Sequence, residues 1–322
     1  MFNLAIPFDI DSNNQDNKFE KITFAFLNGE ELEDKILRFK HVRSSSVETY
    51  KASLKVFKSF LKKRNLKLIS EDDVISFEIY LSKQNISTYT SISYLYAVKS
   101  FFDILFNRGL YPNVAFDIRT PKKPKGLMRD ALTRDQAKQL LESVKGDDII
   151  AKRDRAILNV LLRCGLRSIE VERSNIEDLR FQKGTPVLFV QGKGRDSKDE
   201  FVVLTKKTSE VIQEYLSLRK ETRAREPLFV SHGNRSDKDK SGRLQTRSIR
   251  RIVKTYLRRI GLNNSRLTCH SLRHTFATLA LENNASLVSV QKAMRHKSIN
   301  STTAYVDAAY RLKNSAENFI DL

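Results

Sequence analysis

Two short segments near the end of the chain hold side chains that could act on a phosphodiester. His270 and Arg273 lie three positions apart, and His296 is followed nine residues later by Tyr305. A guanidinium can bind two non-bridging phosphate oxygens, an imidazole can move protons near neutral pH, and a phenol oxygen can become a covalently bound nucleophile. Each residue alone is more often part of the core or the surface, so the prediction depends on their spacing.

A third candidate lies upstream, where Arg167 and Glu170 follow an apolar helical run at 156–162. Residues three positions apart share one helical face, so the carboxylate would orient the guanidinium. Gly165 can end the first helix so that another begins beside it. The alternative is an ordinary surface ion pair, which contributes little.

A glycine-rich basic turn separates two β-rich runs, 185–191 and 200–204. Such a pattern predicts a hairpin, and residues 175–179 are candidates for a third strand. Lys193 lies in the turn between two glycines, which would allow its backbone to approach a partner closely. A solvated turn lysine is the alternative.

Taken together and in order, these positions resemble the tyrosine site-specific recombinase family, which includes phage integrases and Xer-type enzymes. The resemblance spans residues 20 to 320, through motifs in the second half and through helical pattern and position in the first. It implies that the chain needs no cofactor and no metal. The catalytic positions that match the family are Arg167, Lys193, His270, Arg273, His296 and Tyr305, with Glu170 as an orienting residue.

The resemblance also implies a mechanism. Tyr305 would attack a scissile phosphate and become linked to the DNA 3′ end while a 5′ hydroxyl leaves. Arg167, Arg273 and His296 would hold the non-bridging oxygens. Lys193 would protonate the leaving oxygen and His270 would assist with the tyrosine proton.

One position departs from the family pattern, which usually has a small glycine before the third histidine. Arg295 stands there in this chain. A positive φ at Arg295 would cost energy. Either the turn differs, or Arg295 takes another conformation in which it could face DNA.

Composition agrees with a nucleic-acid partner, since 58 Lys and Arg against 38 Asp and Glu give a net charge of +20. No apolar run approaches the ~20 residues of a membrane span, so we expect a cytoplasmic protein without membrane association. Two cysteines suggest reduced thiols and offer no zinc spacing. Candidate DNA contacts, with a solvated surface as the alternative, are Lys122, Lys123 and Lys125 in a basic linker and Arg243, Arg247 and Arg250 in a helical stripe.

The expected fold is mainly α, with a small antiparallel β-sheet in the catalytic part and a clamp around DNA. Helical periodicity appears at 31–42, 47–63, 71–84 and 88–108, and a capping box at Thr133 opens another helix. The expected domains are an N-terminal tail at 1–17, a SAM-like helical core-binding domain at 18–118, a basic linker at 119–130, and a catalytic domain at 131–322 that ends in a docking helix at 308–320.

The sequence therefore predicts a site-specific DNA recombinase that serves DNA integration, excision or dimer resolution, for example in a mobile element. Its partners would be double-stranded DNA and a tetramer on two sites, formed by this chain alone or with a paralogue, with possible accessory DNA-bending or directionality factors. The alternatives are a topoisomerase IB-like or telomere-resolving enzyme, or a non-catalytic DNA-binding regulator.

Overall fold

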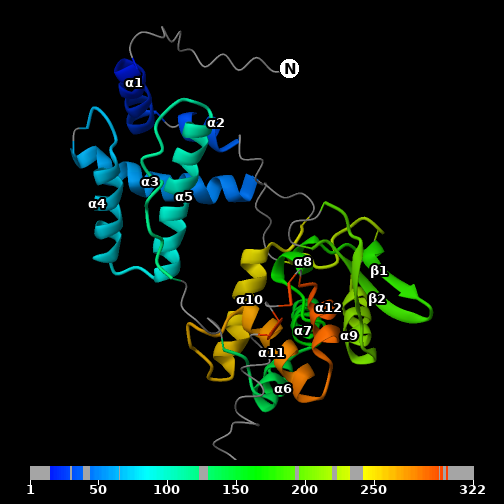
Figure 1. Cartoon of the computed structure of the whole chain (residues 1–322). Helices are drawn as coiled ribbons and strands as arrows, with labels where there is room; N and C mark the ends of the chain where they lie inside the picture. The colour runs from blue at the N-terminus through cyan, green and yellow to red at the C-terminus, as the bar shows by residue number, and fades with distance from the viewer. Residues whose placement is uncertain are drawn as a thin grey trace, which may run out of the picture. The chain divides into compact units, whose positions relative to one another are not determined.

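The computed structural model describes residues 15–29, 31–38, 44–64, 66–122, 130–192, 196–219, 223–232, 242–296, 298–299 and 302–303. The chain divides into two compact units, Met1–Lys125 and Gly126–Leu322 (Figure 1). This division falls inside the basic segment 119–130 that the sequence suggested as a linker. The finer domain limits remain predictions.

The regular secondary structure in the described part of the N-terminal unit is all helical, as the apolar periodicity predicted. Phe26, Phe57, Phe77 and Phe101 are buried at its centre, with ring centroids 4.8 Å apart for Phe26 and Phe101. Helix α1 was not predicted. The helical elements are α1 (Gln15–Asn28), α2 (Glu31–Arg38), α3 (Ser44–Leu61), the short 3-10 helix η1 (Lys62–Arg64), α4 (Glu71–Ser82) and α5 (Thr88–Asn107).

Local signals explain where two of these helices begin and end. Ser70 caps α4 and forms a capping box with Asp73, whose carboxylate accepts the Ser70 backbone N–H at 2.9 Å. Gly109 follows α5 with a φ of +62°, a conformation that favours glycine.

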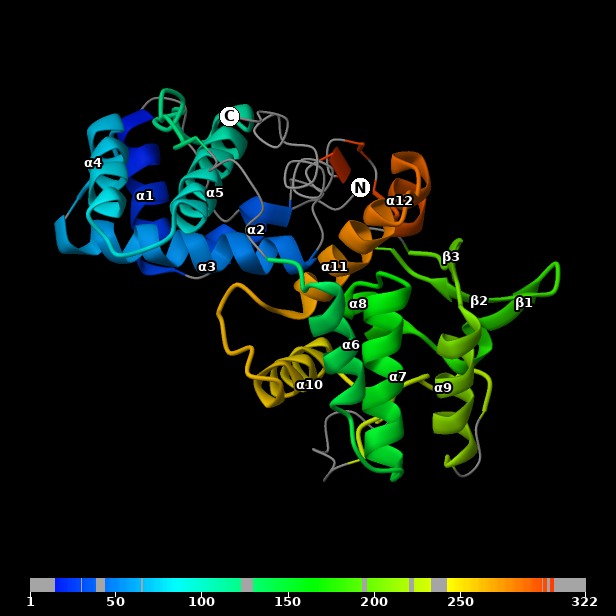
Figure 2. The ribbon, with the colours of Figure 1, turned by 90° about the horizontal axis from the view of Figure 1, so that it is seen from below.

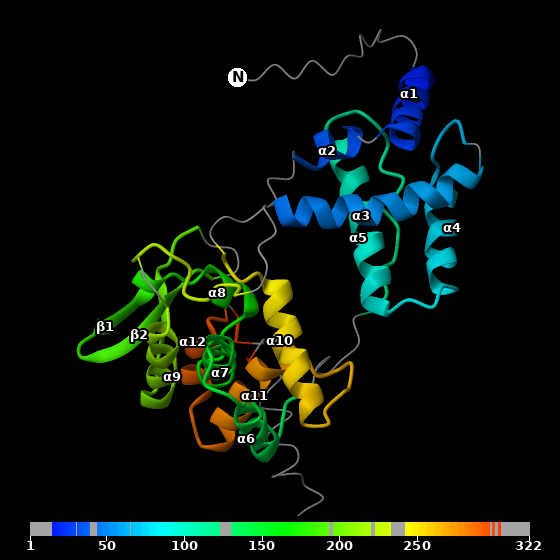
Figure 3. The same ribbon diagram turned by 180° about the vertical axis from the view of Figure 1, so that it is seen from behind.

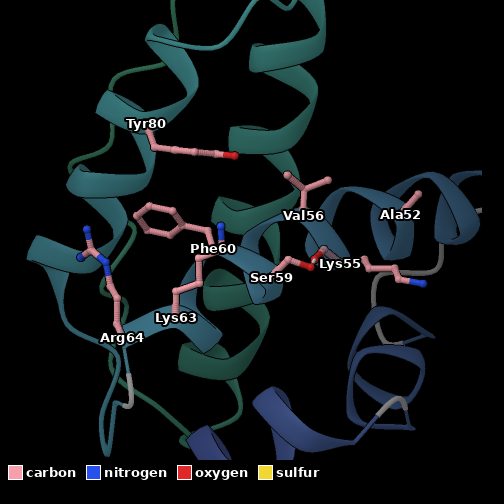
Figure 4. Close-up of a pocket in the computed structure, with 8 residues that line it drawn as sticks. All are labelled: Ala52, Lys55, Val56, Ser59, Phe60, Lys63, Arg64 and Tyr80. Carbon is pink, nitrogen blue, oxygen red and sulfur yellow. Dashed lines mark hydrogen bonds between the residues drawn. The ribbon is translucent and has the colours of Figure 1, made fainter.

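An open groove of about 450 Å³ lies between α3 and α4 (Figure 4). Phe60 and Tyr80 point toward one another, with ring centroids 5.0 Å apart. The Arg64 guanidinium lies 4.5 Å from the centre of the Phe60 ring. Lys55 and Lys63 also line the groove, which therefore combines an aromatic wall with a basic rim.

The C-terminal unit combines helices with a small antiparallel sheet, and this confirms the expected fold class. Helix α7 is buried against α9 and α11, while the described strands pair in the order β1-β2-β3 (Figure 2). The elements are α6 (Arg134–Glu142), α7 (Ile149–Arg163), α8 (Ser168–Arg173), β1 (Leu179–Gln182), β2 (Thr185–Val190), β3 (Glu200–Val203), α9 (Lys206–Ser217), α10 (Thr246–Arg259), α11 (Cys269–Glu282) and α12 (Leu287–Met294).

The third strand is present, but the prediction that it covers 175–179 was wrong. Residues Ile176–Asp178 form a 3-10 turn, and β1 begins only at Leu179. The Asp178 carboxylate explains the turn because it accepts the Asn175 backbone N–H at 2.6 Å and pairs with Lys198 at 2.5 Å.

In the part of the chain that the structure describes, no helix combines the length and apolar character that crossing a membrane requires.

Candidate active site

Gly165 makes the turn between α7 and α8 that the site depends on. Its φ is +59°, and a Cβ built on it would lie 2.5 Å from Cδ1 of Phe276 in α11. Both the backbone conformation and the close approach of Phe276 therefore require glycine. The Gly165 carbonyl accepts a hydrogen bond from Nη1 of Arg273 at 2.5 Å.

Arg167 and Glu170 form the pair that their spacing predicted. Nη1 of Arg167 donates to Oε1 of Glu170 at 2.8 Å, and the Arg167 backbone N–H donates to Oε2 at 2.7 Å. The Glu170 side chain is completely buried, whereas that of Arg167 is 23 % exposed. Nε and Nη2 of Arg167 donate to no other described residue, so that edge of the guanidinium can receive a ligand.

Arg295 also contacts Glu170 and lies at the end of α12. Its φ is +53°, so the turn takes the left-handed conformation despite the bulky residue. Nη2 of Arg295 donates to Oε2 of Glu170 at 2.6 Å and Nη1 donates to the Ala293 carbonyl at 2.6 Å. The alternative in which Arg295 faces DNA was wrong, because its side chain points inward and is 3 % exposed.

The charge state of Glu170 follows from these contacts. Burial raises the pKa of its carboxyl, but the charge and hydrogen bond of Arg295 and the backbone N–H and charge of Arg167 outweigh burial and hold the pKa below its usual value. Arg273 adds a third guanidinium, with Nη1 4.0 Å from Oε2.

Arg273 is fully buried in α11 and joins two helix ends. Its Nη1 donates to the Gly165 carbonyl after α7, and its Nη2 donates to the Met294 carbonyl at the end of α12. In Figure 3, α7, α11 and α12 lie close to one another, beside α10. The guanidinium thereby holds the Gly165 turn and the end of α12 close to one another.

His296 follows α12 and is oriented by Thr302. Its Nδ1 lies 2.9 Å from Oγ1 of Thr302, whose side chain is buried. With the Thr302 hydroxyl as donor, the ring proton is on Nε2, which can then donate to a phosphate oxygen. Burial lowers the pKa of His296 to about 4, assisted by the positive charges of Arg273 and Arg167, by His270 and by Arg295.

His270 lies exposed in the first turn of α11. Its ring centroid is 4.7 Å from that of the buried His274, in an edge-to-face arrangement. Thr268 caps this helix by accepting the His270 backbone N–H at 3.3 Å. His270 is exposed in this first turn, whereas Arg273, three residues later, is fully buried.

The structure thus brings Arg167, Glu170, Arg273 and His296 together. Two predicted catalytic residues, Lys193 and Tyr305, lie outside the described residues, as do Lys123, Lys125 and the segment 308–320. Sequence reasoning missed the contact of Arg295 with Glu170 and the role of Thr302, although Thr302 belongs to the Ser/Thr-rich stretch before Tyr305.

The predicted basic stripe is only partly helical. Arg247 and Arg250 are exposed on α10, and Lys122 is exposed before the second unit. Arg243, however, precedes the helix, which begins at Thr246, so its assignment to the stripe was wrong. Its guanidinium instead donates to the Glu172 carbonyl at 2.6 Å and to Oδ1 of Asn175 at 2.7 Å.

Neither cysteine offers a reactive thiol. Cys164 and Cys269 are free and buried, and burial raises the pKa of each thiol to about 12. Within the described residues, no three His, Cys, Asp or Glu side chains are grouped so that they could hold a metal ion.

Known proteins resemble most of the chain in sequence. Residues 130–311 match the phage integrase family, and residues 30–110 match the N-terminal SAM-like domain of phage integrases. The tyrosine recombinase XerD of Oceanobacillus iheyensis is 30 % identical over 286 residues, which cover 85 % of this chain and 92 % of the relative. The tyrosine recombinase XerC of Thermodesulfovibrio yellowstonii is 30 % identical over 264 residues, covering 81 % and 85 %.

Two solved structures show the same fold. The XerH site-specific recombinase in a post-cleavage complex with palindromic difH substrate aligns with a TM-score of 0.69 at 22 % identity, covering 95 % of this chain and 90 % of that one. A lambda integrase dimer bound to a COC′ core site gives a TM-score of 0.66 at 16 % identity, covering 86 % and 96 %. With its site geometry, fold and relatives in agreement, the chain belongs to the phage integrase family and is a tyrosine recombinase.

Proposed function

We propose that this tyrosine recombinase cuts and rejoins DNA at specific sites through a covalent link between Tyr305 and the 3′ phosphate of the cut strand. The main support is the pair of Arg167 and Arg273 beside the buried carboxylate of Glu170, with His296 near enough for the charges of both arginines to lower its pKa. A phenol nine residues after His296 is close to that cluster along the chain.

The cluster suits a reaction in which negative charge grows on phosphorus. Attack by the Tyr305 oxygen turns the diester into a pentavalent transition state, and the 5′ oxygen then leaves. Nε and Nη2 of Arg167 and Nε2 of His296 would donate to the non-bridging oxygens. Nη1 and Nη2 of Arg273 each carry two N–H groups, so a hydrogen bond to the Gly165 or Met294 carbonyl does not prevent the same nitrogen from donating to a phosphate oxygen.

Two proton transfers complete the step. Lys193 would protonate the leaving 5′ oxygen, and the exposed His270 would take the proton of the tyrosine. The new phosphotyrosine bond preserves the energy of the broken diester. A 5′ hydroxyl from a second duplex can therefore attack it and reseal the strand without metal or ATP.

Several basic surfaces could hold the duplex. In the C-terminal unit these are Arg247 and Arg250 on α10, and in the N-terminal unit the groove with Lys55 and Lys63. The linker lysines Lys122, Lys123 and Lys125 would follow the phosphate backbone between them. We propose that the two units clamp DNA in this way.

Strand exchange between two duplexes needs four nucleophiles. We therefore propose a tetramer on DNA, formed by this chain alone or with a paralogue, in which residues 308–320 of one protomer dock on the next. Accessory DNA-bending factors would set the direction of the exchange.

The function can be tested by trapping covalent complexes. Protein would be recovered from DNA under denaturing conditions for the native chain, for Tyr305→Phe and for Tyr310→Phe, a matched control five residues away. We expect attachment at a defined DNA sequence for the native chain and for Tyr310→Phe only. Ordinary DNA binding without attachment in any of the three would refute the recombinase and support a regulator. Relaxation of supercoils without exchange of partners would instead indicate a topoisomerase.

A further inference from the structure

The carboxylate of Glu170 accepts as many hydrogen bonds as it can. An ionised carboxylate offers about four lone-pair sites. Oε2 accepts from the backbone N–H of Arg167 and from Nη2 of Arg295, at 2.7 and 2.6 Å. Oε1 accepts from Nη1 of Arg167 at 2.8 Å and from Nε of Arg295 at 3.4 Å. No site is left for a second nitrogen of the Arg167 guanidinium.

Arg295 supplies half of these bonds at a cost to its own backbone. A residue with a side chain in the left-handed conformation loses about 1–2 kcal/mol, a strain that glycine would avoid. The side chain is nonetheless 3 % exposed and aimed at a completely buried carboxylate. Strain that persists because surrounding contacts fix it often marks a functional position.

We propose that Arg295 is a positioning residue for strand cleavage, because it fills the Glu170 carboxylate and so leaves two nitrogens of Arg167 for the scissile phosphate. Without Arg295, two lone-pair sites of Glu170 would open, and Arg167 could turn to bind Glu170 with both ends of its fork. The inference rests on the proposed function, since it assigns Arg167 to the phosphate.

The charges of the cluster agree with this role. Three guanidinium groups, from Arg167, Arg273 and Arg295, surround one carboxylate, so two positive charges are left over. A phosphodiester carries one negative charge, and the transition state of attack by a tyrosinate carries two. Removing Arg295 would leave a cluster that still balances the bound diester but not the transition state. Cleavage should therefore suffer more than binding.

The test compares Arg295→Gln, Arg295→Lys and Glu170→Gln with the double variant of Arg295→Gln and Glu170→Gln. Lys292→Gln is the matched control, since it removes a positive charge from the exposed face of α12. The probe is a nicked duplex that carries the DNA segment recovered with the native protein. The readouts are the dissociation constant and the single-turnover rate of covalent complex formation from pH 5 to pH 9.

For Arg295→Gln we expect a cleavage rate lower by roughly tenfold to a hundredfold, with a dissociation constant within about threefold of the native value. The cleavage rate of Arg295→Lys should lie between that of the native protein and that of Arg295→Gln. Adding Arg295→Gln to Glu170→Gln should lower the rate no further. Arg167, Arg273 and Arg295 are the charged groups that contact Glu170, so losing Arg295 should also move the acidic limit of cleavage to higher pH.

Three results would overturn the inference. One is an Arg295→Gln variant that cleaves DNA as fast as Lys292→Gln does. Another is a double variant whose cleavage rate falls by the product of the effects of Arg295→Gln and Glu170→Gln alone. The third result does not depend on cleavage. It is a double variant in which the changes in the free energy of unfolding caused by Arg295→Gln and by Glu170→Gln simply add. A native protein that forms no covalent complex would refute the proposed function instead, and the unfolding cycle would still decide whether the two residues act as a pair.

Discussion

Replacing Gly165 with alanine tests how the site is held together. Two costs add at this position. An alanine at a φ of +59° loses about 1–2 kcal/mol in the left-handed conformation. Its Cβ would also lie 2.5 Å from Cδ1 of Phe276, and forcing a methyl group into packed surroundings costs about 1–3 kcal/mol. We expect the free energy of unfolding of the C-terminal unit to fall by about 2–5 kcal/mol.

Gly184→Ala is the matched control, because Gly184 has a φ of +78° but no atom within 4 Å of the place that an added methyl group would take. Its cost should be about 1–2 kcal/mol, from the backbone alone. Urea unfolding of the full chain, followed by circular dichroism, would measure both variants. Because the chain has two compact units, the transition of the C-terminal unit should move while that of the N-terminal unit stays in place.

A second substitution separates the clash from the backbone strain. Shortening the aromatic side chain in the double variant of Gly165→Ala and Phe276→Leu should recover part of the loss relative to Phe276→Leu alone. Equal losses for Gly165→Ala and Gly184→Ala, with no recovery in the double variant, would contradict the close approach of α11 to the Gly165 turn.

Three further predictions concern charged residues. Arg243→Gln should lower the free energy of unfolding by about 1–3 kcal/mol, because the oxygens of Glu172 and Asn175 lose their donor. Arg250→Gln should instead weaken DNA binding with little change in the free energy of unfolding. The reverse pattern would refute both assignments. Replacing Lys55 and Lys63 with glutamine should reduce the slope of log affinity against log salt by about 2, and an unchanged slope would exclude the groove from the DNA interface. The pKa of His296 is about 4 in the folded protein and 6.5 in the unfolded chain, so the unfolded state binds the proton first as the pH falls. The free energy of unfolding should therefore fall more steeply from pH 6.5 to pH 4 in the native chain than in His296→Asn.

The sequence located much of the site because its spacing reflects local helical geometry. Their separation of three residues correctly predicted the contact of Arg167 with Glu170, but Arg167 is the extended residue that precedes α8 and Glu170 lies in the first turn, so the two meet at a helix start and not on one helical face. The capping box at Thr133 and the β-rich runs likewise depend on nearby residues, and both elements are present in the structure.

Helix α1 was not predicted, although the spacing of its residues indicates a helix. Phe19, Ile22, Thr23 and Phe26 repeat at three- and four-residue intervals, and the last three are buried. Arg243 shows the opposite error, since its spacing continued the stripe of α10 to a residue that precedes the first turn of that helix. Sequence periodicity cannot mark where a helix begins when the side chain of the residue before it forms no capping hydrogen bond, as at Gln245.

The contact of Arg295 with Glu170 lay beyond sequence reasoning for a different reason. The two residues are 125 positions apart and meet where Arg273 donates both to the Gly165 turn and to the end of α12. A penalty at a positive φ could be foreseen, but the buried ion pair that offsets it depends on tertiary structure.

The most direct test of the account is to identify the amino acid and the DNA end in the trapped covalent complex. After nuclease and protease digestion, mass spectrometry would locate the nucleotide on a peptide. We predict a nucleotide joined through its 3′ phosphate to Tyr305. Attachment to Tyr310 or another residue, or linkage through a 5′ phosphate, would contradict the mechanism.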